Sequence, residues 1–226
     1  MRLAPLAVAV VVVLGAAAPS CTRTVSLPQP GLRVEAQTRD LAAQVTGVPP
    51  TALGATHRPG CPVGPDRLRL IRMNHWGFDG RVHRGEMVVH ERVVRPLLYV
   101  FGEAFRARFP IRRIRPVSVY GGDDAKSMAD DNTSAFNCRR VTGDASRLSR
   151  HTYGDAVDIN PVENPYVDRF GTAHPPASRP HLRRDRTAPG MIRPGDVVTR
   201  AFAEVGWRWG GRWSHRDYQH FSATGG

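Results

Sequence analysis

The amino-acid sequence predicts an α+β fold, with a small antiparallel sheet and packed helices, in one domain at residues 61–226. Segments with strand periodicity and segments with helical periodicity both occur. They do not alternate in the regular strand–helix–strand order that a parallel sheet requires. The chain is long enough to bury one core, and it shows no internal repeat and no coiled-coil heptads. These observations together indicate a single mixed domain.

The first elements of this domain are predicted to be strands. Residues 66–73 (DRLRLIRM) alternate apolar and basic side chains, which is typical of a half-buried strand. Residues 76–90 (WGFDGRVHRGEMVVH) predict a turn followed by a second strand. A third strand is predicted at Ile114–Tyr120, where the sequence IRPVSVY ends at two glycines.

Two helices are predicted from apolar spacing and end signals. In residues 91–110, Pro96 suits a first helical turn and Pro110 marks the stop. The apolar residues of this segment recur at helical spacing: Val93, Val94, Leu97, Leu98, Phe101 and Phe105. A shorter helix is predicted at residues 196–206, with Asp196 as its N-cap and Gly206 at its end.

The remaining segments of the domain are predicted to be mostly irregular. The polar residues 121–149 predict a long loop, and ordered loops of this length inside a domain are more often functional than decorative. Residues 163–194 are rich in Pro, Arg and His, which indicates a surface insertion. The closing segment 207–221 predicts a strand, a turn and a strand.

The start of the chain has the layout of a secretory signal peptide, assigned to residues 1–20. Arg2 precedes an apolar run at residues 3–14, which is too short for a typical membrane span and is followed by small residues. One expected outcome is cleavage near residues 16–18. The other is lipidation of Cys21 and a membrane tether, although an alanine stands three places before it, where a larger aliphatic residue is usual. Either outcome predicts an extracellular or cell-envelope protein.

Residues 21–60 predict a linker or loosely packed lead-in to the domain. They mix Pro, Gly, Thr and Ala with few aromatic residues, which is typical of a linker. One short helix is predicted within them, around Val34–Val45.

The cysteine content agrees with export. Once Cys21 is lipidated or removed, Cys61 and Cys138 form an even pair. In an oxidising compartment such a pair is expected to form a disulfide, and the alternative is two buried thiols.

The chain is strongly basic, and this favours an anionic partner. It has 32 Lys and Arg residues against 20 Asp and Glu residues, for a formal net charge of +12. For an exported protein, cell-wall polymers and acidic peptides fit better than nucleic acid, and no nucleic-acid-binding motif is present. The sequence carries no signal for an oligomeric state.

Four residues in two short stretches carry the predicted chemistry. His151 and Asp158 lie in SRHTYGDAVDIN, and Asp217 and His220 lie in RDYQHF. Two imidazoles and a carboxylate, with one coordination position left for water, form the ligand set of a catalytic zinc ion. Asp158 lies on a predicted strand whose neighbouring side chains face the core, and a lone carboxylate there needs a partner. The spacing of Asp217 and His220 lets the first act as a general base while the second binds the metal.

These stretches resemble the VanY-like zinc D-alanyl-D-alanine carboxypeptidases. The resemblance rests on Ser-x-His-x-x-Gly-x-Ala-x-Asp-x-Asn at residues 149–160 and on Trp-x-Trp-Gly-Gly-x-Trp at residues 207–213. The Asp-x-x-His-Phe sequence at residues 217–221 and the segment NTSAFNCR, which ends at Arg139, are also similar to this family. The similarity runs from about Cys61 to Phe221.

The resemblance implies a fold of the hedgehog and zinc DD-peptidase kind and a set of residue roles. Zinc (Zn²⁺) is expected on His151, Asp158 and His220, with Asp217 as the base. Many relatives carry glutamate at the base position, and aspartate occurs in the endopeptidase branch. Arg139 is the candidate for binding the substrate carbonyl or terminal carboxylate, because a guanidinium offers fixed paired donors.

Ser149 is expected to contact the substrate, and the alternative is a turn-forming serine. The implied substrate is the stem peptide of peptidoglycan, and the implied activity is D-alanyl-D-alanine carboxypeptidase. An L-alanyl-D-glutamate endopeptidase would use the same metal site. A non-catalytic cell-wall-binding module that keeps the zinc is the alternative from another class. The loops at 121–137 and 163–194 are expected to determine the choice of substrate.

Overall fold

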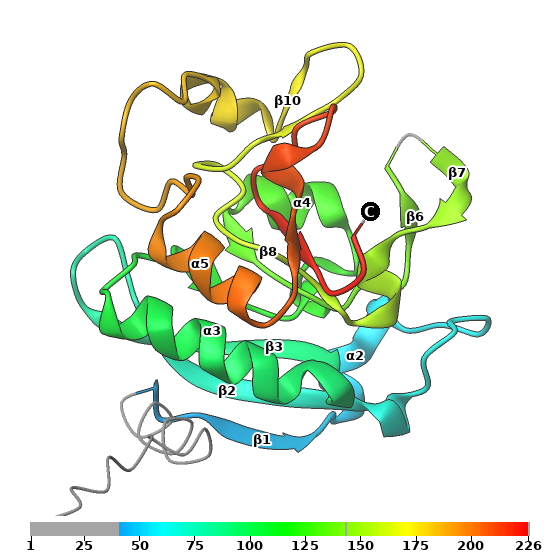
Figure 1. Cartoon of the computed structure of the whole chain (residues 1–226). Coiled ribbons are helices and arrows are strands. Elements are labelled where there is room, and N and C mark those ends of the chain that lie inside the picture. The colour runs from blue at the N-terminus through cyan, green and yellow to red at the C-terminus, as the bar shows by residue number, and fades with distance from the viewer. Residues whose placement is uncertain (1–40, 143, 226) are drawn as a thin grey trace, which may run out of the picture.

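The structure, a computed structural model, describes residues 41–142 and 144–225, and it is mixed α/β with small antiparallel sheets and few helices (Figure 1). This agrees with the predicted α+β class. The first sheet has the order β1-β2-β3, formed by Gln44–Gly47, Leu68–Trp76 and Val82–His90. Helix α3, Val94–Arg106, lies across β2 and β3 in Figure 1 and contacts β2. The strands predicted at 66–73 and 76–90 are confirmed as β2 and β3.

The second sheet brings together strands that are distant in the sequence. Its order is β11-β12-β8, formed by Arg208–Trp209, His220–Ser222 and Ala156–Asp158. Helix α5, Val197–Glu204, packs between this sheet and α3. The Asp196 side chain accepts a hydrogen bond from the Thr199 N–H, so the predicted N-cap is confirmed. The predicted strand, turn and strand at 207–221 are confirmed as β11, the 3₁₀ turn Gly210–Arg212 and β12.

The core forms where the two sheets and the helices meet. Its buried side chains come from β2, β3, α3, β8, α5 and β12, and include Met73, Val89, Phe101, Val157, Phe202 and Phe221. Phe202 and Phe221 stack with their ring centroids 3.9 Å apart. Because α5 and β12 are fastened to the core in this way, the segment that carries His220 has a fixed position.

The predicted strand at Ile114–Tyr120 is wrong for most of its length. Only Arg113–Ile114 form a strand, β4, which pairs with β5 at Asn132–Thr133. Val117–Tyr120 form a 3₁₀ turn instead. Pro116 has no N–H to donate to a sheet ladder, so the strand cannot continue through it.

The predicted loop 121–149 and the predicted insertion 163–194 contain short regular elements. The first holds α4 at Asp124–Ala129, and a hairpin of β6 at Arg140–Val141 with β7 at Asp144–Leu148. The second holds a hairpin of β9 at Tyr166–Val167 with β10 at Ala173–His174. A 3₁₀ turn follows at Pro176–Leu182. In Figure 1 the β6–β7 hairpin projects at the right, and the loop beside β10 projects at the top.

The described part of the predicted lead-in is packed against the domain. β1 pairs with β2, and helix α2, Pro50–Leu53, follows it. Leu41 and Leu53 are buried in the apolar core clusters. Within the described residues, chain packed against the core is therefore already present at Leu41, and the domain bounds 61–226 stay a prediction. Most of the predicted helix around Val34–Val45 lies outside the described residues, and so do the signal peptide and Cys21.

No helix in residues 41–142 and 144–225 has both the length and the apolar character needed to cross a membrane.

Candidate metal centre

Three side chains with metal-binding atoms meet on neighbouring elements. Asp158 ends β8 and His220 begins β12, and the two residues lie directly opposite each other in the antiparallel register. His151 lies in the 3₁₀ turn Arg150–Tyr153, which leads into β8. All three are buried, and one ligand atom from each lies within 4.8 Å of the other two. The three ligands predicted from the sequence are thus brought together.

The distances between these atoms suit a single small metal ion. His220 Nδ1 lies 2.9 Å from Asp158 Oδ1 and 3.2 Å from His151 Nε2. His151 Nε2 lies 3.1 Å from Asp158 Oδ2. Ligands held in a tetrahedron at about 2.0–2.1 Å from zinc lie roughly 3.3 Å from one another, so the donor set and its spacing fit that ion.

The orientation of the His151 ring is fixed by a hydrogen bond at the nitrogen that points away from the cluster. Its Nδ1 lies 2.6 Å from the carbonyl oxygen of Ala135, which can only accept a hydrogen bond. Nδ1 therefore carries the proton, and Nε2 presents its lone pair to the cluster. Ser134 contributes to the same arrangement, because its backbone exchanges hydrogen bonds of 3.0 and 2.9 Å with the backbone of Asp158.

The cluster is strongly coupled electrostatically. Burial alone would raise the pKa of Asp158, but His151 and His220 hold that pKa well below its usual range. Burial alone would lower the pKa of His151, but the Asp158 carboxylate raises it. Without a metal, the site favours an ionised carboxylate beside a protonated imidazole. A bound metal ion would take the place of that proton.

Asp217 lies in the same pocket and is held by its backbone. Its N–H donates to the Gly210 carbonyl at 3.1 Å, and it forms an isolated antiparallel bridge with Tyr166. Burial, opposed by His220 and reinforced by Asp158, raises the pKa of Asp217 to about 7. Its Oδ1 is buried and has no hydrogen-bond partner. A buried carboxyl with a pKa near neutrality is suited to accept and return a proton.

The other two predicted site residues line this pocket too. Arg139 is mostly buried, and its Nη2 lies 2.8 Å from Asp124 Oδ2. Ser149 is buried and accepts a hydrogen bond from the His151 N–H at 3.3 Å, so it does form the turn that the alternative predicted. It also lines the pocket, and a contact of Ser149 with substrate stays a prediction.

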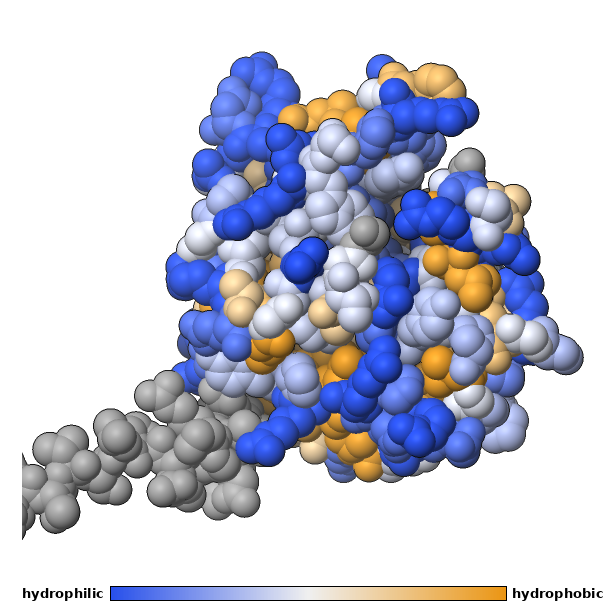
Figure 2. All heavy atoms as spheres, turned by 45° about the vertical axis from the view of Figure 1, so that its right-hand side comes forward, coloured by the Kyte–Doolittle hydropathy of each residue, from blue (hydrophilic) through white to orange (hydrophobic). Residues whose placement is uncertain are grey.

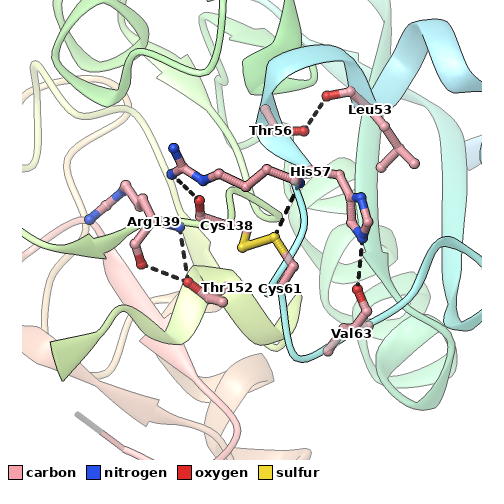
Figure 3. The surroundings of a disulfide bond; sticks show 9 residues. Leu53, Thr56, His57, Cys61, Val63, Cys138, Arg139 and Thr152 are labelled. Atoms are coloured by element: carbon pink, nitrogen blue, oxygen red, sulfur yellow. Dashed lines mark hydrogen bonds between the residues drawn. A yellow bond between two sulfur atoms is a disulfide. The ribbon is translucent and has the colours of Figure 1, made fainter.

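A disulfide supports the wall that carries Arg139. Cys61 and Cys138 are bonded, as the cysteine count predicted, and Figure 3 shows this bond beside Arg139 and Thr152. The Thr152 hydroxyl donates to the Arg139 carbonyl at 2.7 Å and accepts from the Arg139 N–H at 3.0 Å. The disulfide-bonded segment is therefore joined to the turn that carries His151.

Several residues of the pocket were missed by the sequence analysis. Asp124 lies on α4 within a predicted loop, and Tyr166 lies on β9 within a predicted insertion. Met128 and Gln219 also line the pocket, and the Gln219 amide nitrogen lies 3.4 Å from the Met128 sulfur. Of these, only Gln219 had a signal in the sequence, because it stands between Asp217 and His220.

A buried His–Asp–His cluster beside a carboxyl of raised pKa, in an open pocket, is the arrangement of a metal-dependent hydrolase. Residues 142–223 match the family described as D-alanyl-D-alanine carboxypeptidase, and this segment contains all four residues of that arrangement. The match confirms the resemblance and supports a peptidase, over a segment shorter than half of the chain. No curated protein and no solved structure matches the chain significantly.

Proposed function

We propose that the protein is an exported zinc-dependent peptidase that hydrolyses peptidoglycan stem peptides, with D-alanyl-D-alanine carboxypeptidase as its activity. The single observation that carries this proposal is the meeting of His151, Asp158 and His220 beside Asp217, inside the segment that matches the carboxypeptidase family. The proposal includes a fold of the hedgehog and zinc DD-peptidase kind. The Cys61–Cys138 disulfide supports an oxidising compartment and hence export.

The roles of the residues follow from their chemistry. His151, Asp158 and His220 would hold the zinc ion, and when bound the ion supplies a Lewis acid and lowers the pKa of water. The Asp217 carboxylate takes a proton from the attacking water and then returns it to the leaving amine. Arg139, held at the pocket wall by Asp124, would donate hydrogen bonds to the substrate carbonyl as negative charge develops on it.

The experiment that tests this proposal combines metal analysis with peptide hydrolysis. The chain without its leader is assayed for zinc content and for hydrolysis of a pentapeptide stem ending in D-Ala-D-Ala, beside Asp217→Ala. We expect one zinc per chain, release of D-Ala, and a variant that keeps the metal but loses activity. Cleavage higher in the stem would indicate the endopeptidase. Zinc without any cleavage would indicate a cell-wall-binding module, and absence of zinc would contradict the proposal.

A further inference from the structure

The pocket beside the candidate metal centre contains more basic side chains than the proposed chemistry uses. Besides the two histidine ligands, three arginines and one further histidine line it: Arg139, Arg147, Arg150 and His215. A substrate that brings a negative charge into this pocket would meet these groups. Which of them is free to pair with that charge can be decided from their existing partners.

Two of the arginines are already paired within the protein. Both terminal nitrogens of Arg139 are engaged, one with Asp124 at 2.8 Å and the other with the Arg140 carbonyl at 3.1 Å. Arg150 pairs with the fully buried carboxylate of Asp155, and its guanidinium lies 4.6 Å from the centre of the Tyr153 ring. Taking Arg139 away would leave the Asp124 carboxylate without its cation, and taking Arg150 away would leave the buried Asp155 carboxylate with Arg92 alone, each at a free-energy cost.

Arg147 differs from both. It is exposed on β7, and among the residues that the structure describes its side chain has no ion pair and no hydrogen bond. Asp144, on the same strand, is affected by its charge, but the Asp144 carboxylate is bonded to the Ser146 N–H at 3.0 Å and to the Ser146 hydroxyl at 2.5 Å. The guanidinium of Arg147 can therefore bind a ligand without breaking a contact.

The position of Arg147 relates it directly to the metal centre. β7 is followed by Ser149 and then by the turn that carries His151. Arg147 and the candidate metal ligand His151 therefore belong to one continuous wall of the pocket. The pocket volume is about 270 Å³, which is at the lower end for ligand sites and suits the end of a short peptide. Figure 2 shows hydrophilic and apolar side chains intermingled over the face that it presents.

We propose that Arg147 binds the terminal carboxylate of the substrate and thereby sets a preference for peptides with a free carboxyl end. This inference rests on the proposed function and names a second recognition residue for it. Arg139 then remains the residue for the substrate carbonyl, through its Nε, which is buried and has no hydrogen-bond partner among the described residues. A guanidinium binds a carboxylate through two parallel N–H bonds, and loss of such a pair at a partly exposed site should weaken binding about 10- to 100-fold.

The test compares two peptides that differ only at the carboxyl end. Both are stem pentapeptides, one with a free terminal carboxylate and one with a terminal amide. Their binding to the zinc-loaded Asp217→Asn chain is measured by calorimetry, so that turnover does not interfere. Arg147→Gln is introduced in this background. Arg140→Gln is the matched control, because Arg140 is exposed on the neighbouring strand β6 and does not line the pocket.

We expect the free acid to bind at least tenfold more tightly than the amide in the parent and in the control. In Arg147→Gln this preference should disappear while binding of the amide is unchanged. An equal loss for both peptides would overturn the proposal, because it would indicate an effect on the shape of the hairpin. A parent that shows no preference, or binds neither peptide, would overturn it as well.

Two more variants locate the carboxylate site if Arg147 is not the residue. Loss of the preference in Arg139→Gln or in His215→Gln, with Arg147→Gln retaining it, would assign the site to one of those residues and overturn the proposal. Failure of the proposed function looks different. In that case the chain with Asp217 intact hydrolyses neither peptide, yet the preference in binding still depends on Arg147.

Discussion

His220 and Asp158 occupy directly opposed positions on β12 and β8, and their side chains meet with His220 Nδ1 2.9 Å from Asp158 Oδ1. A cross-strand pair of this kind is rigid because the backbone ladder fixes both Cα atoms. Two of the three candidate metal ligands are therefore positioned by sheet pairing, and the third by the turn that leads into β8. This preorganisation leads to the first prediction.

Asp158→Asn and His220→Ala should each abolish stoichiometric zinc binding while the chain stays folded. Each variant leaves only two ligands of the set, and a missing ligand removes most of the affinity. In a thermal melt, zinc should stabilise the parent by about 4 kcal/mol at a thousandfold excess over its Kd, and the variants hardly at all.

The matched control for these variants is Asp79→Asn, at an exposed aspartate that pairs with His83 at 2.9 Å outside the pocket. Zinc stabilisation equal to that of the parent is expected for the control. Zinc stabilisation retained in both ligand variants would contradict the assigned metal centre.

Asp217 makes the metal-free protein less stable as the pH rises. Burial raises the pKa of its carboxyl from 3.8 to about 7, so the folded state binds a proton that the unfolded state has released over this range. Stability is thus lost between pH 4 and pH 7, roughly. Asp217→Asn should be more stable than the parent at pH 8 by a few kcal/mol, and about equally stable at pH 4. Urea unfolding of the metal-free chains at both pH values measures this difference.

Glu163 should produce a second pH dependence, away from the metal centre. It is buried, and burial together with the neighbouring Asp131 raises its pKa to about 8. Arg112 Nη2 lies 3.8 Å from Glu163 Oε1, and Arg112 Nε lies 3.4 Å from Asp131 Oδ2. One exposed guanidinium thus forms ion pairs with both carboxyl groups. The folded pKa is raised, so stability falls as the pH rises from about 4.5 through 8.

Glu163→Gln should remove this fall and unfold at higher urea concentration than the parent at pH 9, in the zinc-loaded state. The control is Glu86→Gln, because Glu86 pairs with Arg72 at the surface. An identical pH profile for Glu163→Gln and the parent would show that the Glu163 carboxyl titrates normally.

Gly210 is predicted to be needed for the position of Asp217. A Cβ added at Gly210 would lie 2.6 Å from the carbonyl oxygen of Asp217 and 3.0 Å from the Cβ of Asp217. The carbonyl oxygen belongs to the backbone, so the backbone of Asp217 would have to shift to make room. Gly210→Ala should therefore lower kcat about tenfold or more while the zinc content stays at one per chain. Gly47→Ala, whose added Cβ meets nothing within 4 Å, is the control and should leave kcat unchanged.

Reduction of the Cys61–Cys138 disulfide should destabilise the protein strongly. The bond closes a loop of 77 residues, for which the chain-entropy relation gives about 4.5 kcal/mol. The double variant Cys61→Ser, Cys138→Ser should unfold at the lower temperature of the reduced parent, and a reductant should not change it further. A melting temperature of the parent that does not respond to reductant would contradict this assignment.

The grouping of His151, Asp158 and His220 was predictable in part, because the positions of His151 and Asp158 depend on contacts between near neighbours in the sequence. Val157 and Ile159 are buried in the apolar core cluster. The side chain of Asp158, between them, belongs to the His–Asp–His cluster instead, as the alternation of the strand predicted. Gly154 adopts φ +66°, which permits the tight turn between His151 and β8. These relationships act over a few residues, and sequence periodicity records them.

The rest of the pocket was not predictable because it depends on tertiary contacts. Asp124 and Arg139 are 15 positions apart in the printed sequence and meet only through the packing of α4. The burial of Asp131 beside Glu163 arises from the pairing of β4 with β5 and the loop after β8. No apolar pattern marks such residues, since each is polar and lies in a segment without periodicity.

The separation of 62 residues between Asp158 and His220 has a consequence for the order of events during biosynthesis. A nascent chain that stops short of His220 holds two of the three candidate ligands, and β8 has no β12 to pair with. The candidate metal centre is thus completed late, after the whole segment between these residues has been made. The peptidase activity proposed for this chain would in this way be absent until synthesis is nearly finished.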